Sequence, residues 1–517
     1  MWRDELEIWL IARDSGSLRE LFHNMRFEAH PALWYLVNYA LSRLTSDPFA
    51  MQVTSLLVGT GAAALILWRA PFGLPLRVLL CFGYLVAYEF TIISRSYGLE
   101  LLLALGFCAL WPQRRRRLPW LALSLFLLAN TNLYGAILAA AFGLLLGIEV
   151  ARPADGERWP VTGMTLACAA LIAAGIIVGA GDVWLQQRRI GPSHAFVPRL
   201  ADPAWYAESV GNVAVGYLPL PRLGDRHFWN GSALELVPRT VRPWVGAALG
   251  AALLGLSAAC LVRRPRMLLA FSLAVAAMVC ITLFFWRGQM RQHLQPLVAF
   301  LVCAWLLRSD AARGGGGAER RLSTPAGDRR WPASRRSPGA EPRDGSPSWD
   351  GVLLPGFLGA LFAVQVVAWS HAFGMDYMRP FSNARAAASF LHAQDLDGVT
   401  FVGSIDYAVQ AVAGYGIGPI YYPESDRFGT FVHWGAERLP LVEPKDVLAA
   451  AIRVLDERAR PVVLITSYAL FSHAEPAEFL AAPGVRVRPL GRFEGAIVPT
   501  EDFHLYHLDR VSRGSGR

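Results

Sequence analysis

The feature that most constrains this chain is a series of ten long apolar stretches separated by short polar segments. About 20 apolar residues in an α-helix cross the hydrocarbon core of a bilayer, and most of these stretches approach that length. They lie at residues 48–68, 73–93, 97–112, 118–132, 134–150, 160–181, 242–262, 267–286, 291–307 and 351–371. The sequence therefore predicts a polytopic α-helical membrane domain of about ten helices over residues 48–371.

The composition agrees with a membrane protein and excludes other classes. Hydrophobic residues make up 54% of the chain, more than the 45–50% usual for soluble domains. The net charge of +9 comes almost wholly from arginine, since Lys445 is the only lysine. This bias indicates GC-rich coding and hence a bacterium. The sequence has no basic stripe with interleaved aromatic residues, so it does not predict nucleic-acid binding. The six cysteines lie in apolar stretches without CxxC spacing, which argues against disulfides and thiolate metal sites.

Arginine-rich loops orient the predicted spans. Cytoplasmic loops of membrane proteins carry an excess of Lys and Arg. If the spans alternate, the four basic loops, at Arg69–Arg77, Arg114–Arg117, Arg263–Arg266 and the Gly/Pro/Ser-rich segment 309–350, all fall on one side, which we assign to the cytoplasm. The outer face then holds residues 1–47, 94–96, 182–241, 287–290 and 372–517. Six arginines in 182–241 run against this orientation, and an outer N-terminus implies a further transmembrane helix upstream of Met1.

Residues 1–47 are predicted to form two short helices on the outer face. The first covers residues 4–22 and is weakened by Ser-Gly-Ser at 15–17. The second covers residues 31–44, opens with Pro31 at a favourable first position, and carries an apolar stripe at helical spacing. Fourteen residues reach only about 21 Å, so this helix is too short to span and is expected to lie in the membrane interface.

Residues 372–517 change character and predict a small soluble α/β domain with a largely parallel sheet. Helices are expected at Phe381–Gln394, Tyr407–Tyr415 and Asp446–Ala459, and strands at Gly398–Ile405, Ile420–Pro423, Pro461–Thr466, Val485–Arg488 and Phe503–Leu508. The domain contains no GxGxxG, Walker or GxSxG motif. An accessory, non-catalytic role is the simpler interpretation.

Two features of residues 1–47 point to chemistry. The adjacent acids Asp4 and Glu5 can simply complement a helix dipole, but at a membrane edge a carboxylate can act as a general base toward a hydroxyl or share a divalent cation. His30 precedes a proline, and a histidine in this position is a plain hydrogen-bonded residue about as often as it is a functional one. The alternative is a contact to a phosphate or a metal at the start of the second helix.

Arginines recur at the predicted outer turns. Arg95 lies in the turn 93–97, and Arg287 and Arg291 flank another turn beside His293. Arginine at a span boundary often only extends its charged end to the interface. Here these residues share a predicted face with Asp4, and a guanidinium binds phosphate bidentately.

Three segments in this order resemble the GT-C glycosyltransferases. They are DELEIWLIARDSG at 4–16, EAHPALWYL at 28–36 and SRSYGLELLLAL at 94–105. They are similar to the protein-mannosyltransferase-like and aminoarabinose-transferase-like branch over about residues 2–110. Members of that branch carry an acid pair after a first transmembrane helix, a His-Pro or Lys-Pro element opening a second juxtamembrane helix, and an Arg-x-Tyr-like element.

The resemblance implies a GT-C-like fold and an inverting transferase that moves a sugar from a polyprenyl-phosphate carrier to a hydroxyl of a lipid, glycan or protein on the outer face of the bacterial inner membrane. It makes Asp4 the base and Glu5 its support. The candidate substrate-binding residues are His30, Arg95, Tyr97, Arg188, Arg189, Arg287, Arg291 and His293.

A divalent cation is left open. The aminoarabinose transferases place a metal-binding glutamate directly before Lys-Pro, whereas this chain has Ala29 there and Glu28 one position earlier. Glu28 and His30 are therefore the metal candidates, and His194 or His227 could supply a later ligand.

Two other functions remain to be weighed. A transporter or flippase of lipid-linked glycans would show inverted repeats or acids in mid-span, and neither is evident. A non-catalytic membrane scaffold would explain the C-terminal domain but not the acids and arginines gathered on one face.

Overall fold

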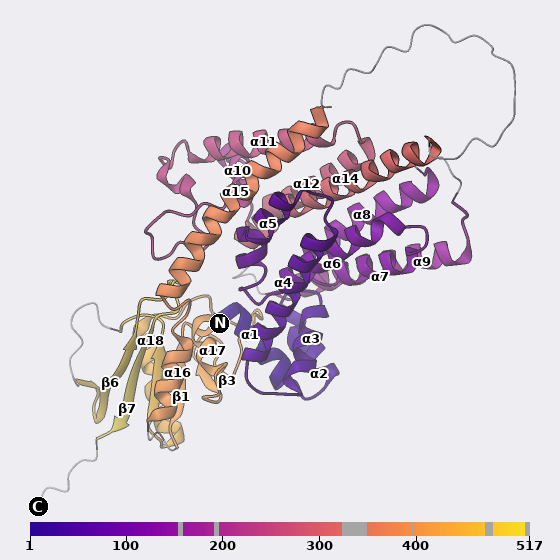
Figure 1. The fold of residues 1–517 in the computed structure, drawn as a ribbon. Coiled ribbons are helices and arrows are strands. Elements are labelled where there is room, and N and C mark those ends of the chain that lie inside the picture. Colours follow the sequence, from indigo (N-terminus) through magenta and orange to yellow (C-terminus); the bar gives the residue numbers. More distant parts are fainter. Residues whose placement is uncertain are drawn as a thin grey trace, which may run out of the picture.

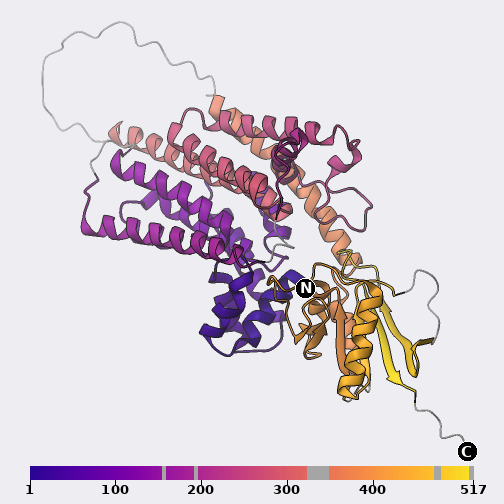
Figure 2. The ribbon, with the colours of Figure 1, turned by 180° about the vertical axis from the view of Figure 1, so that it is seen from behind.

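The computed structural model describes residues 1–153, 159–190, 196–322, 349–394, 396, 398–470 and 479–511. A long helical body carries the N-terminal helices and a sheet-containing domain side by side at one end (Figure 1). The view from behind shows the same arrangement (Figure 2). The chain is thus a polytopic helical membrane protein with a C-terminal α/β domain, as the sequence predicts.

Seven helices in the described part of the chain are long and apolar enough to span a membrane. They are α4 (Phe49–Arg69), α8 (Leu133–Ala151), α9 (Gly163–Gln187), α11 (Arg242–Leu261), α12 (Pro265–Phe284), the run Met290–Ala312 through α13 (Met290–His293) and into α14 (Gln295–Leu322), and Leu353–Met378 within α15 (Trp349–Met378). Two further predicted spans are shorter helices, α6 (Ser96–Leu110) and α7 (Leu118–Ala129).

The predicted span 73–93 is not one helix. It is divided into α5 (Leu74–Cys81) and a π-helical turn, η2 (Tyr84–Glu89), because Gly83 between them has an extended backbone with ψ 151°. A buried backbone amide freed by such a break needs a partner. Gln365 of α15 supplies one, since its Oε1 accepts a hydrogen bond of 3.0 Å from the amide of Leu85.

The predicted outer loop 182–241 and basic segment 309–350 also contain helix. α10 (Pro203–Tyr217) lies within the former and packs against α11. Small residues allow this close approach: a Cβ on Gly250 would lie 2.4 Å from the carbonyl oxygen of Val210. α14 continues to Leu322, and residues 323–348 lie outside the described residues.

Charged side chains gather at the two ends of the helical body as the loop analysis predicts. At one end, Arg114 lies 2.7 Å from Glu149 and 3.3 Å from Asp310, and Arg266 lies 3.1 Å from Glu149. The N-terminal helices and the C-terminal domain lie at the other end (Figure 1). The assignment of these ends to cytoplasm and exterior stays a prediction.

The C-terminal domain contains a seven-stranded sheet of order β3-β2-β1-β4-β7-β6-β5. The strands are β1 (Thr400–Ser404), β2 (Ile420–Tyr422), β3 (Arg427–Gly429), β4 (Val462–Thr466), β5 (Phe479–Ala482), β6 (Val485–Phe493) and β7 (Phe503–Arg510). The prediction of a largely parallel sheet was wrong: only β1 pairs in parallel, with β2 and β4, and the other described pairings are antiparallel. Hairpins formed by β3 and β5, two short strands that the sequence analysis missed, account for part of the difference.

Helices cover both faces of this sheet. Alternate residues of a strand point to opposite faces. Accordingly, Val463 and Ile465 of β4 pack with α16 (Ala384–Ala393) and α17 (Asp406–Ala413), whereas Val462 and Leu464 pack with α18 (Pro444–Arg458).

Helix α1 (Arg3–Asp14) lies between the two parts of the protein. Leu6 belongs to the core of the C-terminal domain, whereas Trp9 packs with Trp34 of α3 (Leu33–Ser42). The prediction of one helix over residues 4–22 was wrong, because the chain leaves the helix at Ser-Gly-Ser and a separate helix, α2 (Leu18–Asn24), follows. The N-terminal segment is therefore a packed connector between the helical body and the α/β domain.

Helix α3 buries the face opposite to its apolar stripe. Trp34, Tyr35 and Asn38 are buried in the protein, whereas Leu33, Leu36, Val37, Ala40 and Leu41 of the stripe stay partly or fully exposed. An outward apolar stripe on a short helix suits the membrane interface. This geometry agrees with the interfacial placement predicted from helix length.

Labelling of single cysteines tests the predicted orientation. Arg19→Cys on α2 should react with a membrane-impermeant maleimide in intact cells, whereas Arg116→Cys between α6 and α7 should react only after permeabilisation. Both positions are exposed. The unmodified chain, with its six native cysteines, gives the background. The reverse pattern would overturn the orientation.

Truncation of Leu6 tests the connecting role of α1. Leu6→Ala removes a fully buried side chain from the C-terminal core and should lower the free energy of unfolding by about 2–5 kcal/mol. The matched variant Leu18→Ala, at a side chain 51% exposed, should change it little. Thermal unfolding of the full chain in detergent measures both, and equal effects would contradict the connecting role.

Candidate functional site

An ion pair between Asp4 and Arg291 lies at the centre of the candidate site. Asp4 stands in the first turn of α1, and its Oδ2 accepts a hydrogen bond of 2.8 Å from Nη2 of Arg291 on α13. The guanidinium of Arg95, just before α6, donates to the backbone carbonyl of Asp4. The side chain of Asp4 is 24% exposed, so it remains reachable. Residues far apart in the sequence thus meet around one carboxylate.

The positive surroundings keep Asp4 ionised. Burial alone would raise its pKa, but the charges of Arg291, Arg95 and Arg3 outweigh burial and leave the pKa below its usual value. At neutral pH Asp4 is therefore a carboxylate that can accept a hydrogen bond from a hydroxyl.

His30 is neutral and lies against Arg95. Burial and the charge of Arg95 lower its pKa to about 4, so Nε2 accepts a hydrogen bond of 2.9 Å from Nη2 of Arg95. Gln186 at the end of α9 fixes the backbone of His30 through bonds of 3.2 and 3.1 Å. His30 thereby holds one terminal nitrogen of Arg95, while the other donates to the carbonyl of Asp4.

Both guanidiniums retain unused donors. Nε of Arg95, and Nε and Nη1 of Arg291, are buried and have no hydrogen-bond partner among the residues that the structure describes. A buried charged donor without a partner is costly. An anion with several oxygens, such as a phosphate, would satisfy these donors.

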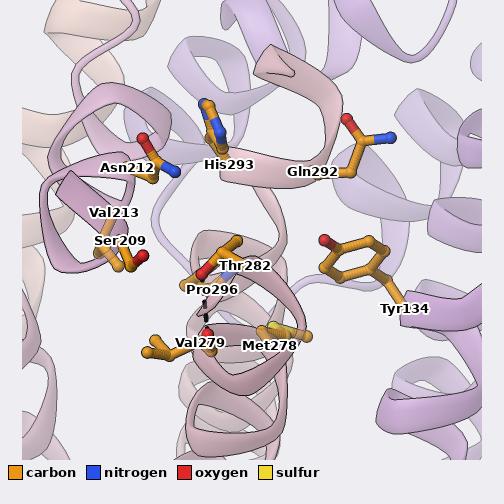
Figure 3. Close-up of a pocket in the computed structure, with 10 residues that line it drawn as sticks. All are labelled: Tyr134, Ser209, Asn212, Val213, Met278, Val279, Thr282, Gln292, His293 and Pro296. Carbon is orange, nitrogen blue, oxygen red and sulfur yellow. Dashed lines mark hydrogen bonds between the residues drawn. The ribbon is translucent and has the colours of Figure 1, made fainter. Parts of the chain in front are cut away.

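A small recess opens among the helices near this site. Figure 3 shows Tyr134 and Gln292 on one side and Ser209 and Asn212 on the other. Gln292 follows Arg291 in α13, and its Nε2 donates a hydrogen bond of 2.7 Å to the hydroxyl of Tyr97. The remaining lining residues are Val213, Met278, Val279, Thr282, His293 and Pro296. The predicted residues Tyr97 and His293 thus connect the ion pair to a recess among predicted spans.

Several predicted residues lie away from Asp4. Arg287 stacks on Trp205 and pairs with Glu208 of α10. Arg188 and Arg189 follow the end of α9 and are exposed. Among the described residues, the side chains of these three arginines form no hydrogen bond or ion pair with Asp4 or Arg291, although the carbonyl of Arg287 lies 3.1 Å from Nε2 of His293.

Glu5 faces a different direction from Asp4. Its Oε1 accepts a hydrogen bond of 2.5 Å from the amide of Ser94, and Oε2 accepts one of 3.0 Å from the amide of Trp2. Adjacent residues of a helix point about 100° apart. Glu5 therefore ties α1 to the turn that carries Arg95 rather than sharing the site of Asp4.

The candidate metal ligands are engaged elsewhere. Glu28 accepts a hydrogen bond of 3.1 Å from the hydroxyl of Tyr35, and the guanidinium of Arg95 occupies the Nε2 side of His30. No group of three His, Cys, Asp or Glu side chains converges among the described residues. His227 lies 2.8 Å from the carbonyl of Ile497 through Nδ1, and His194 lies outside the described residues. The divalent cation stays a prediction, and we derive no step through one.

The sequence analysis missed Glu7 and Trp434. Glu7 follows Asp4 by three positions on α1 and accepts a hydrogen bond of 2.8 Å from Nε1 of Trp434 in the C-terminal domain. The spacing of Asp4 and Glu7 on one helical face could have identified Glu7. No local signal marks Trp434, which the tertiary fold brings there.

A solved structure is similar to this chain, whereas no protein-family model and no curated protein matches its sequence. Among solved structures, the chain is similar to the crystal structure of ArnT from Cupriavidus metallidurans bound to undecaprenyl phosphate, with 12% identity and a TM-score of 0.41. The alignment covers 98% of this chain and 93% of that chain. At this level of similarity the match assigns no family and no activity.

The pH dependence of the free energy of unfolding tests the ion pair between Asp4 and Arg291. A carboxylate whose pKa is lowered by folding stabilises the protein above its unfolded pKa, and this contribution is lost as the pH falls through the folded value. Asp4→Asn should therefore unfold more readily than the parent at pH 7, by about 3 kcal/mol.

The difference between Asp4→Asn and the parent should shrink below about pH 4, where the free carboxyl of the unfolded chain protonates. Asp446→Asn, at an exposed position of α18, is the matched control. Thermal unfolding in detergent across pH measures the effect, and a difference independent of pH would contradict an ionised Asp4.

Proposed function

We propose that this protein is a membrane glycosyltransferase that moves a sugar from a polyprenyl-phosphate carrier to an acceptor hydroxyl. The observation that carries the proposal is an ionised, reachable carboxylate, Asp4, that is paired with Arg291 and lies beside Arg95, two buried guanidiniums with unused donors. A carboxylate can accept a hydrogen bond from the acceptor hydroxyl, and guanidiniums can donate hydrogen bonds to the carrier phosphate. The resemblance of the three sequence segments to GT-C enzymes supports the same reaction.

In this proposal the arginines stabilise the leaving group. As the bond from the sugar to the phosphate oxygen breaks, negative charge grows on the carrier phosphate. Unpaired N–H groups of Arg95 and Arg291 would donate to it, and donors placed before the reaction stabilise such charge most effectively. Neutral His30 leaves the charge of Arg95 available because it accepts a hydrogen bond without adding charge of its own.

Asp4 orients the acceptor in this scheme. Its carboxylate would accept a hydrogen bond from the acceptor hydroxyl and present the oxygen to the anomeric carbon on the side opposite to the phosphate. Attack from that side inverts the configuration. Holding both reactants in one geometry contributes much of the rate that an enzyme provides.

The carrier reaches the site from the membrane in this proposal. Arg291 lies at the start of the membrane-spanning run Met290–Ala312, and an isoprenoid chain is apolar. The site would then face the exterior of a bacterial inner membrane, where the acceptor is a lipid, a glycan or a protein. Pocket shape decides which sugar and which acceptor are used.

Transfer assays on variants test the proposal. Membranes containing the full chain should transfer labelled sugar from a panel of polyprenyl-phosphate-linked hexoses and pentoses to endogenous acceptors. Asp4→Asn should lower kcat/KM about 10²-fold because it removes the carboxylate that positions the hydroxyl. Arg95→Gln should lower it about 10²–10³-fold, the loss typical of one donor to a developing anion.

Asp446→Asn serves as the matched control and should keep the activity of the parent. Transfer by Asp4→Asn at the parent rate would contradict the role of this carboxylate. Absence of transfer by the parent from every carrier in the panel would contradict the proposed function.

A further inference from the structure

A second carboxylate lies one turn after Asp4 on the same face of α1. Glu7 is buried, and both acids feel the charge of Arg95. Residues three apart on a helix are neighbours. Among the described residues no guanidinium hydrogen-bonds or pairs with Glu7, unlike Asp4, and Oε1 of Glu7 accepts a hydrogen bond of 2.8 Å from the indole of Trp434.

A stack of side chains fixes this indole. Arg438 forms a buried ion pair of 2.5 Å with Asp406 and lies 4.6 Å above the ring of Trp434. The ring of Trp434 in turn stacks on Tyr407 at 6.3 Å and an interplanar angle of 20°. Arg3 of α1 covers the ring of Tyr407 at 4.8 Å. The C-terminal domain thus holds one N–H group rigidly against Glu7.

The surroundings of Glu7 set its proton affinity. Burial and the charge of Asp4 raise its pKa, whereas hydrogen bonds from Trp434 and Gln410 and the charge of Arg95 lower it, and the result is a pKa of about 7. Glu28 lies on the other side, where burial and Glu7 raise its pKa well above the usual value. The pKa of Glu7 is therefore raised, whereas that of Asp4 is lowered, so Glu7 is the more basic of the two carboxylates.

We propose that Glu7 is the general base of the transfer reaction and that the C-terminal domain, through Trp434, holds it in place. This inference rests on the proposed function. The hydroxyl oxygen of the acceptor forms a bond to the anomeric carbon, the bond from that carbon to the phosphate oxygen breaks, and polyprenyl phosphate leaves with the electron pair. The hydroxyl proton passes to the carboxylate of Glu7 and then to solvent.

The different partners of Asp4 and Glu7 give the two acids different roles. Asp4 is bound to Arg291, so its lone pairs are stabilised and it is the weaker base, suited to orienting the hydroxyl. A base acts best when its pKa is near the working pH. Glu7 meets this condition, and Trp434 is a positioning residue that acts through it.

The pH dependence of transfer tests the assignment. With full-length chain in membranes and a polyprenyl-phosphate-linked sugar that supports transfer, kcat/KM of the parent should rise with pH through an inflection near 7 as Glu7 ionises. Glu7→Gln should lose this inflection and lower the rate about 10²–10⁴-fold. Glu7→Asp should retain the inflection and recover part of the rate.

Trp434→Phe supplies a second, independent readout. It removes the N–H group that stabilises ionised Glu7, so the inflection should move to higher pH while the plateau rate changes less. Glu443→Gln, at an exposed position before α18, is the control and should keep the parent profile. Thermal unfolding of each variant separates loss of folding from loss of the base.

The experiments distinguish failure of the Glu7 assignment from failure of the proposed function. An unchanged rate and inflection in Glu7→Gln would overturn the assignment and leave the proposed function intact. If Glu7→Gln does not fold, an unmoved inflection in Trp434→Phe overturns it instead. Absence of transfer by the parent overturns both the proposed function and the role of Glu7.

Discussion

The ion pair between Asp4 and Arg291 is the interaction on which the rest of the site depends. α1 is buried on nearly every side, yet its first two turns carry three acids. Burying a charge is costly unless it is paired. Arg291 on α13 pairs with the carboxylate of Asp4, and Arg95 in the turn before α6 donates to the backbone carbonyl of Asp4, so this end of the acidic helix is held where those two turns meet. The ion pair therefore positions α1 against the helical body.

The same helix joins the soluble domain to the membrane domain. Leu6 completes the core of the α/β domain, and the amide of Arg3 donates a hydrogen bond of 2.7 Å to buried Glu501. From the α/β domain, the indole of Trp434 donates a hydrogen bond to Glu7 of α1. A domain that looked like an accessory in the sequence thus contributes a side chain beside the candidate catalytic carboxylates, and its packing helps to keep α1 in place.

Local patterns predicted much of the fold for identifiable reasons. Apolar length predicted most long helices, whereas the predicted helix 4–22 is divided into α1 and α2 at Ser-Gly-Ser. The interruption at Gly83 depends on Gln365, about 280 positions away, and α10 depends on close packing with α11. In the site, Asp4 and Glu5 are equivalent acids in the sequence. Only the direction of each side chain on α1 separates the carboxylate that meets Arg291 from the one that meets the amide of Ser94.

The sequence by itself determined that this is a polytopic helical membrane protein with a C-terminal α/β domain, because hydropathy and periodicity are properties of short segments. It also selected Asp4, His30, Arg95 and Arg291 as candidates that the fold brings together. The tertiary structure alone decided that Arg287, Arg188 and Arg189 lie elsewhere, that the sheet is mixed, and that Glu7 and Trp434 belong beside Asp4. Such contacts join positions hundreds of residues apart, and their energies depend on burial and direction, which no local pattern records.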